Sequence, residues 1–146
     1  MPSSPVTSTT SDSDVTTMLT GAPVTMLLPV MNLTRARDFY EQKLGLQPLG
    51  LKLDGKFEYA CGGSTGATLA LFPKPEGTKA EHTALSFQVR DIAAAIQELE
   101  EKGVQFEDYD YPDLKTKDHV CVLGSEKAAW FKDTEGNYLC IHQDIA

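Results

Sequence analysis

The chain has 146 residues, a length that suits one domain rather than two independent ones. Apolar residues make up 41% and charged residues 23%, so the chain can bury a core while keeping a charged surface. Its formal net charge of −8 argues against binding to nucleic acid or to an anionic membrane surface, because phosphate groups repel an acidic protein. The negative electrostatic field of such an acidic protein is compatible with a cationic ligand.

Residues 1–21 are predicted to form a flexible N-terminal tail. The first twenty residues contain eleven Ser or Thr and no Lys or Arg, a composition that buries too little apolar surface to order itself. A secretory signal would need a basic start followed by an apolar run. The apolar stretch 26–31 is far too short to span a membrane. We therefore expect one folded domain over residues 22–146.

The three cysteines, Cys61, Cys121 and Cys140, are an odd number at irregular spacing. They form neither a disulfide framework nor a CxxC metal motif. A reducing compartment, the cytoplasm, is the predicted location.

An internal repeat indicates the architecture. Two strand-like segments, 25–30 and 84–89, are each followed by apolar residues at helical spacing, and the two copies align at an offset of 59 residues. Asn32 and Asp91 stand at equivalent positions before the two helices. Their side-chain oxygens can accept hydrogen bonds from the first helical turn, so both are predicted N-caps.

Each predicted helix ends at a glycine, Gly45 or Gly103, and is followed by strands. These strands are predicted at 46–53, 56–61 and 67–72 in the first copy, and at 104–109, 119–122 with 127–132, and 138–142 in the second. The fold class is therefore α+β, with two tandem βαβββ modules over residues 23–73 and 81–146 and a linker at 74–80.

Period-two alternation predicts which side of each strand faces the helix. Leu85, Phe87 and Val89 are bulky and apolar and should pack beneath the helix, which leaves Ala84 and Ser86 on an open side. The open sides should form a concave cleft of small, polar and aromatic residues, although an ordinary solvated sheet has a similar composition. The predicted cleft residues are Thr25, Tyr59, Ala70, Phe72, Ala84, Ser86, Trp130, Tyr138 and Cys140.

Two segments resemble a known superfamily. The first is the helix sequence RARDFYEQKLGL after a strand that ends in Val30, and the second is the strand-turn-strand sequence WFKDTEGNYL at 130–139. Both are similar to the vicinal oxygen chelate superfamily, which contains glyoxalases, extradiol dioxygenases, epimerases, fosfomycin-modifying enzymes and metal-free drug-sequestering proteins such as the bleomycin-resistance proteins. The resemblance implies that the two modules form a shared cleft.

The metalloenzymes of this superfamily use His, Gln or Glu ligands that point inward from the first and last strands of each module. The equivalent positions here are Thr25, Ala70, Ala84 and Cys140, and a single thiolate does not make a site. The resemblance therefore predicts no metal and no cofactor. His82 and His142 should be offset by roughly 13 Å if their strands run parallel, and His119 lies in another segment, so we do not expect them to share an ion.

Three functions remain open. The first is a metal-free small-molecule binding protein, in its narrowest form an antibiotic-sequestering one, whose cleft would stack on an aromatic or cationic ligand. The second is a glyoxalase-like lyase, isomerase or dioxygenase, which the missing ligands disfavour. The third is a structural or regulatory protein with a vestigial cleft, and the sequence does not separate it from the first. No nucleic-acid or membrane partner is expected, and a homodimer is left open.

Overall fold

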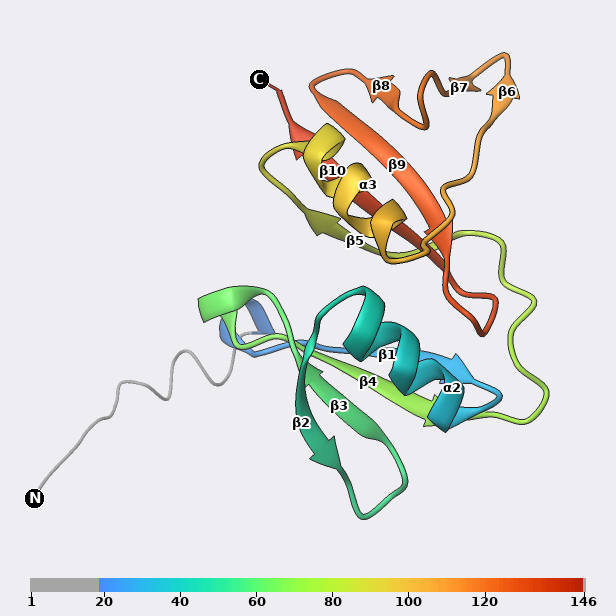
Figure 1. The fold of residues 1–146 in the computed structure, drawn as a ribbon. Coiled ribbons are helices and arrows are strands. Elements are labelled where there is room, and N and C mark those ends of the chain that lie inside the picture. Colours follow the sequence, from blue (N-terminus) through green and yellow to red (C-terminus); the bar gives the residue numbers. More distant parts are fainter. Residues whose placement is uncertain (1–18, 146) are drawn as a thin grey trace, which may run out of the picture.

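The computed structural model describes residues 19–145, and these residues form two modules joined by a linker (Figure 1). Most of the predicted tail therefore lies outside the described residues. The first module comprises β1 (Thr25–Val30), α2 (Leu33–Asp38), a π-helical turn η2 (Phe39–Lys43), β2 (Gln47–Leu51), β3 (Phe57–Ala60), a 3-10 turn η3 (Gly63–Thr65) and β4 (Thr68–Pro73). A further 3-10 turn, η1 (Leu19–Gly21), precedes β1. The second module comprises β5 (Thr83–Gln88), α3 (Ile92–Glu101), β6 (Asp110–Tyr111), β7 (Leu114–Lys115), β8 (Cys121–Leu123), β9 (Glu126–Lys132) and β10 (Tyr138–Asp144).

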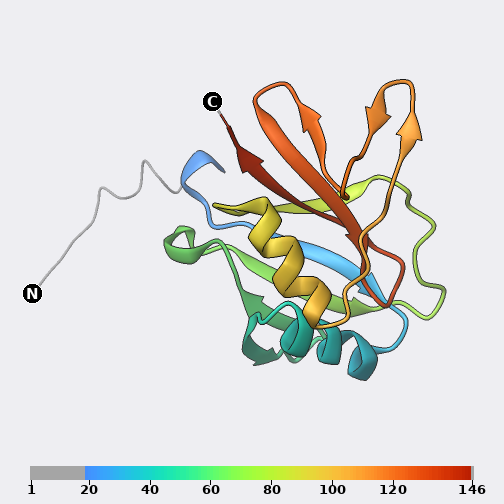
Figure 2. The ribbon, with the colours of Figure 1, turned by 45° about the horizontal axis from the view of Figure 1, so that its top comes forward.

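Each module contains a four-stranded sheet of the same topology. The strand orders are β1-β4-β3-β2 and β5-β10-β9-β8, and in each sheet the first strand pairs in parallel with the last while the other pairs are antiparallel. Each module has its helix on one face of its sheet, as the two ribbon views show (Figures 1 and 2). The predicted α+β class with two tandem βαβββ modules is confirmed.

The residues predicted to face the helices form one core. Leu69, Leu71, Leu139 and Ile141 are buried almost completely, and they belong to a single hydrophobic cluster that includes residues of both modules. Burying an aliphatic side chain of this size contributes about 1.5–3 kcal/mol, so this cluster is the main source of stability. None of the helices in residues 19–145 is long and apolar enough to cross a membrane.

Both helices begin at their predicted N-caps. The Asn32 side chain accepts a hydrogen bond from the Arg35 backbone N–H at 3.0 Å, and the Asp91 side chain accepts one from the Ala94 N–H at 3.1 Å. The first helix does not keep α-helical spacing to its end. After Asp38 it widens into the π-helical turn, which turns the adjacent Phe39 and Tyr40 side chains both into the core.

The region after α3 differs from the prediction. The expected strand at 104–109 makes only an isolated bridge between Phe106 and Phe131, after which the chain forms the short hairpin of β6 and β7. The strand expected from residue 119 begins at Cys121, because Asp118 and His119 adopt positive φ angles of 53° and 72° that do not fit an extended strand.

The turn between β9 and β10 connects the two modules. The buried Glu135 carboxylate accepts hydrogen bonds from the Met31 and Asn32 backbone N–H groups, at 2.9 and 3.0 Å, and pairs with the Arg35 guanidinium at 2.8 Å. Burial raises the pKa of Glu135, but the donors, Arg35 first among them, outweigh it and hold the pKa at about 2. A carboxylate of the second module thus completes the start of the helix in the first.

The neighbouring side chains of this turn make a second connection. Asp133 accepts a hydrogen bond from the buried Tyr40 hydroxyl at 2.5 Å, and the Asn137 side-chain amide donates to the Pro29 carbonyl at 3.0 Å. Burial and the nearby Asp133 carboxylate raise the pKa of Tyr40 well above its usual value, so the phenol stays protonated and donates. These contacts fix the second sheet relative to the first.

Candidate functional site

In each module one face of the sheet packs against the helix, and the opposite face has no helix over it. We call these two opposite faces together the open face. In Figure 1 both α2 and α3 lie in front of their sheets, so the two uncovered faces point the same way. Along β10, Leu139 and Ile141 point to the core, which places Tyr138, Cys140 and His142 on the open face. The predicted orientation of these strands therefore brings polar and aromatic side chains to one side of the molecule.

The second module contributes a row of polar contacts to the open face. Three side-chain hydrogen bonds join β5 to its neighbour β10 and to β9, the strand beyond it, and each involves a residue on this face. They are Trp130 Nε1–H to Thr83 Oγ1 (3.0 Å), Ser86 Oγ with His142 Nδ1 (2.5 Å), and Gln88 Nε2–H to Asp144 Oδ2 (3.2 Å). The Trp130 side chain reaches across β10, because Cys140 lies opposite Trp130 in the strand register.

Three rings form what we call the aromatic ladder: Trp130, Tyr109 and Tyr111. The Tyr109 ring meets Trp130 edge to face at 5.7 Å and stacks on Tyr111 at 6.1 Å, with planes inclined by 28°. Tyr111 is 60% exposed. Burial and the nearby Glu107 carboxylate raise the pKa of Tyr109. The ladder therefore runs from the floor of the open face onto the β6–β7 hairpin.

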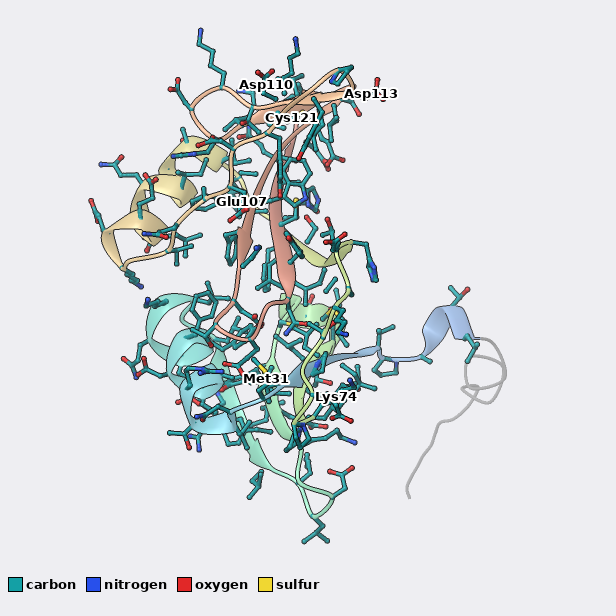
Figure 3. The ribbon with its side chains drawn as sticks, turned by 90° about the vertical axis from the view of Figure 1, so that its right-hand side faces the viewer. Met31, Lys74, Glu107, Asp110, Asp113 and Cys121 are labelled. Atoms are coloured by element: carbon teal, nitrogen blue, oxygen red, sulfur yellow. The ribbon has the colours of Figure 1, made fainter. Side chains whose placement is uncertain are left out.

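The sequence at this hairpin contains four carboxylates, Glu107, Asp108, Asp110 and Asp113, and acidic and aromatic residues alternate from 108 to 111. Asp110 and Asp113 are labelled in Figure 3 near the top of the second module, and Glu107 lies lower in the same module. Asp108 accepts from the Thr116 hydroxyl at 3.2 Å, which ties the two sides of the hairpin together. The hairpin that presents Tyr109 and Tyr111 was not predicted from the sequence.

The first module offers a less polar surface. The Thr68 hydroxyl donates to the Thr25 hydroxyl at 2.9 Å, and Leu27 lies exposed beside them. Ala70 is on the same face of the sheet but is fully buried, and Phe72 is half-buried. This half of the open face can supply apolar contact but few hydrogen bonds.

Tyr59 is not a cleft residue, which corrects the sequence-based assignment. It is fully buried beneath the first helix, where its ring lies 6.2 Å from that of Tyr40 and its hydroxyl donates to Glu41 at 2.8 Å. Burial and the Glu41 hydrogen bond raise its pKa. The alternation of β3 explains the placement, because Phe57 and Tyr59 share the core side and leave Glu58 on the open side.

The other predicted site residues lie on the open faces of their strands. Ala84 and Ser86 are exposed, and Tyr138 is half-buried with the Lys132 ammonium 4.9 Å from its ring. Cys140 is buried at the floor, and burial raises the pKa of its thiol. Alternation along β5 and β10 places Gln88 and Asp144 on the open side as well. Thr83 has the same parity as Leu85 and lies beside Tyr138 because the register shifts between Tyr138 and Leu139.

The residues at the family's metal-ligand positions do not fit a metal ion. The Thr25 hydroxyl is bonded to Thr68, Ala70 and Ala84 have no donor atom, and the protonated Cys140 thiol donates to the Ile141 carbonyl at 3.4 Å. Among residues 19–145, no group of three or more His, Cys, Asp or Glu side chains is arranged to hold an ion. His119 lies apart, between Glu100 and Asp108 at 3.1 and 2.9 Å.

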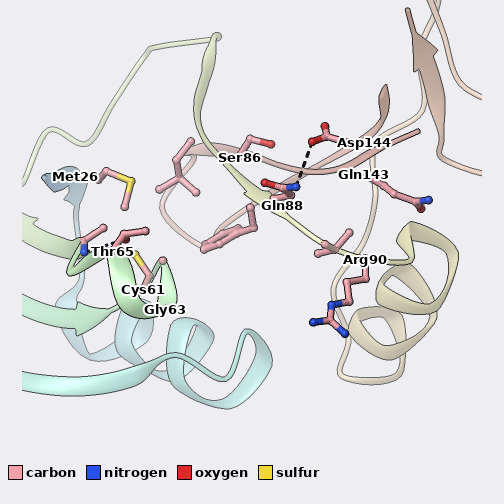
Figure 4. Close-up of a pocket in the computed structure, with 14 residues that line it drawn as sticks. Met26, Cys61, Gly63, Thr65, Ser86, Gln88, Arg90, Gln143 and Asp144 are labelled. Atoms are coloured by element: carbon pink, nitrogen blue, oxygen red, sulfur yellow. Dashed lines mark hydrogen bonds between the residues drawn. The ribbon is translucent and has the colours of Figure 1, made fainter. Parts of the chain in front are cut away.

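A hollow of about 770 Å³ adjoins the open face along the free edge of β5 (Figure 4). Met26, Cys61 and Thr65 line it from the first module, and the consecutive residues 85–90 line it from the second. The glycine-rich segment 62–66 forms a loop here, with a short 3-10 turn between two left-handed glycines. All three cysteines are free.

Comparisons with known proteins define the class. Residues 22–141 match the family model of the Glyoxalase/Bleomycin resistance protein/Dioxygenase superfamily. The chain therefore belongs to this superfamily, as the sequence resemblance predicted. No curated protein matches the chain significantly.

Solved structures agree on the fold. TnmS3, an antibiotic binding protein from Streptomyces sp. CB03234, is 22% identical, with a TM-score of 0.60 over 82% of this chain and 93% of its own. A superfamily member from Sphaerobacter thermophilus DSM 20745 is 23% identical, with a TM-score of 0.64 over 84% of this chain and 96% of its own. An integron cassette protein from the Halifax Harbour sewage outfall is 20% identical, with a TM-score of 0.64 over 84% of this chain and 97% of its own. At these identities the likeness shows the fold alone.

Proposed function

We propose that this protein binds and sequesters flat, cationic small molecules on its open face without a metal ion. The observation that carries the proposal is the aromatic ladder of Trp130, Tyr109 and Tyr111. Rings that stack at 5–7 Å offer a flat ligand large apolar contact at little cost in side-chain entropy. The exposed end of the ladder at Tyr111 leaves room for such a ligand.

The charge of the molecule supports a cationic ligand. The hairpin that carries Tyr109 and Tyr111 also carries Asp108, Asp110 and Asp113, and the chain as a whole has a net charge of −8. A cation over an aromatic face gains about 0.5–2 kcal/mol, and nearby carboxylates add to the attraction. A neutral or anionic ligand of the same shape would lose both contributions.

Antibiotic sequestration is the narrowest form of this proposal. The structural neighbour TnmS3 is described as an antibiotic binding protein, and the family model includes bleomycin resistance proteins. We place the protein in a reducing compartment such as the cytoplasm, which suits its three free cysteines. A homodimer is part of the same proposal, because β1 and β5 each end their sheet with an unpaired edge.

Calorimetric titration with metal-free bleomycin and with proflavine, a planar cation, tests the proposal. We expect saturable binding of at least one of them, and a loss of affinity of about 10-fold or more in Trp130→Ala, since removing a stacking ring costs more than 1 kcal/mol. Leu53→Ala is the control, because Leu53 is fully exposed in the β2–β3 turn. Equal affinity in Trp130→Ala and the unaltered protein, or binding that fails in both, would contradict the proposal.

A further inference from the structure

A serine and a histidine face each other on the open face in a geometry suited to nucleophilic chemistry. Ser86 Oγ lies 2.5 Å from His142 Nδ1, so the hydroxyl proton can pass to the imidazole. The two residues come from β5 and β10, which pair in parallel at one edge of the second sheet. Ser86 is exposed and His142 half-buried, so the pair is held by the sheet yet open to a substrate.

We propose that this pair gives the protein an esterase activity, with Ser86 as nucleophile and His142 as general base. The proposal goes beyond small-molecule binding and rests on it only for docking of the substrate to the open face. Neither residue stands at one of the superfamily's metal-ligand positions. Ser86 is two residues from Ala84, which has no donor atom, and His142 is two residues from Cys140, whose protonated thiol is a poor nucleophile.

The reaction balances without a metal or a redox partner. Ser86 Oγ attacks the ester carbonyl carbon while its proton moves to His142 Nδ1, which forms a tetrahedral oxyanion. The oxyanion collapses, the bond from carbon to the leaving oxygen breaks, and the imidazolium donates its proton to that oxygen, which departs as an alcohol or phenol. Water then attacks the acyl-serine with His142 again as base, which releases the carboxylic acid and regenerates Ser86.

Gln88 is placed to stabilise the oxyanion. It is two residues from Ser86 on the same face of β5 and lies opposite His142 in the strand register. One of its amide N–H groups is held by Asp144 at 3.2 Å (Figure 4), which leaves the second free to donate. A fixed donor near the developing negative charge lowers the barrier to acyl transfer.

The aromatic ladder defines the substrate class. Cys140 lies between Ser86 and Trp130 in the register, so these two residues are two strands apart, a separation of about 10 Å. A substrate whose ring stacks on Trp130 would present a carbonyl one or two bonds from that ring to Ser86. We therefore expect aryl esters and small esters with an aromatic acyl group to react, and long aliphatic esters to react poorly.

Stopped-flow hydrolysis of p-nitrophenyl acetate, with mapping of the acetyl group by mass spectrometry, tests this activity. We expect a burst of one p-nitrophenol per chain, acetylation at Ser86, and labelling of Ser86 by a fluorophosphonate. Ser86→Ala should abolish the burst, and His142→Gln should lower the acylation rate about 100-fold or more. Ser64→Ala and His82→Gln are matched controls, because both residues are exposed and lie outside the strands of the two sheets, and they should retain the full rate.

The outcomes separate this activity from the binding function. If no burst and no label appear, or if the acetyl group maps elsewhere than Ser86, the esterase proposal is wrong, while bleomycin or proflavine binding decides the binding function independently. If Ser86→Ala unfolds, His142→Gln and the position of the fluorophosphonate label in the unaltered protein still decide. A burst that survives in Ser86→Ala would also overturn the proposal.

Discussion

Glu135 is the side chain on which the contact between the modules most depends. It is a fully buried carboxylate, and it is stabilised by two backbone N–H groups, the Thr134 hydroxyl and Arg35, which is half-exposed. A buried carboxylate without such donors would destabilise the fold, because charge is costly to remove from water. The glutamate in the turn sequence DTEGN therefore has a structural role.

Glu135→Gln should lower the free energy of unfolding by about 2–3 kcal/mol at pH 7. This figure allows for the weakening of the ion pair by the solvent around the half-exposed Arg35. Because the folded pKa of about 2 lies below the ordinary value of 4.5, the carboxylate stabilises the fold fully above pH 4.5 and progressively less down to pH 2. Urea unfolding measures the loss of stability that Glu135→Gln causes relative to the unaltered protein, and this loss should be smaller at pH 3 than at pH 7. Glu101→Gln, an exposed control, should change little. A difference that does not vary with pH would contradict this account of Glu135.

Among the elements, the helices and the long strands could be predicted and the short hairpin could not. The repeat, the caps and the alternation identified both helices and the core sides of β5 and β10, because those signals arise from local packing. Strands of two residues, such as β6 and β7, are too short to show alternation. The π-helical turn escaped prediction because it depends on burying Phe39 and Tyr40 together against the second module.

Part of the site depends on how strands far apart in the sequence are aligned with one another in the sheet. The sequence placed Trp130 on the open side because Phe131 takes the core, and it placed Ser86 there as well. The contact of Ser86 with His142 could not be foreseen, because a register shift between Tyr138 and Leu139 sets which residues of β10 lie beside β5. Tyr59 was assigned wrongly because its aromatic side chain suits a core as well as a cleft.

The contribution of the α3 N-cap to stability can be tested by substitution. Asp91→Ala should lower the free energy of unfolding by about 1 kcal/mol, because the Ala94 N–H loses its side-chain acceptor. Chemical denaturation measures the change, with Asp113→Ala in the exposed hairpin as the control. Equal losses in the two variants would mean that the Asp91 contact does not cap the helix.

At the scale of the whole molecule, the two modules form one core on their helix sides and leave one open face on the other. The core excludes water, whereas the open face carries an aromatic ladder, a polar row and a surplus of carboxylates. A ligand-binding protein requires both features, a rigid core that supports the site and a surface with groups that contact the ligand.

The most direct test of the binding function is the fluorescence of Trp130, since the chain has no other tryptophan. In the free protein, acrylamide should quench its emission, because the half-buried indole lies on the open face rather than in the core. Saturation with metal-free bleomycin or proflavine at one ligand per chain should change the emission and protect it from acrylamide. Emission that acrylamide does not reach in the free protein, or that neither ligand alters, would contradict the account.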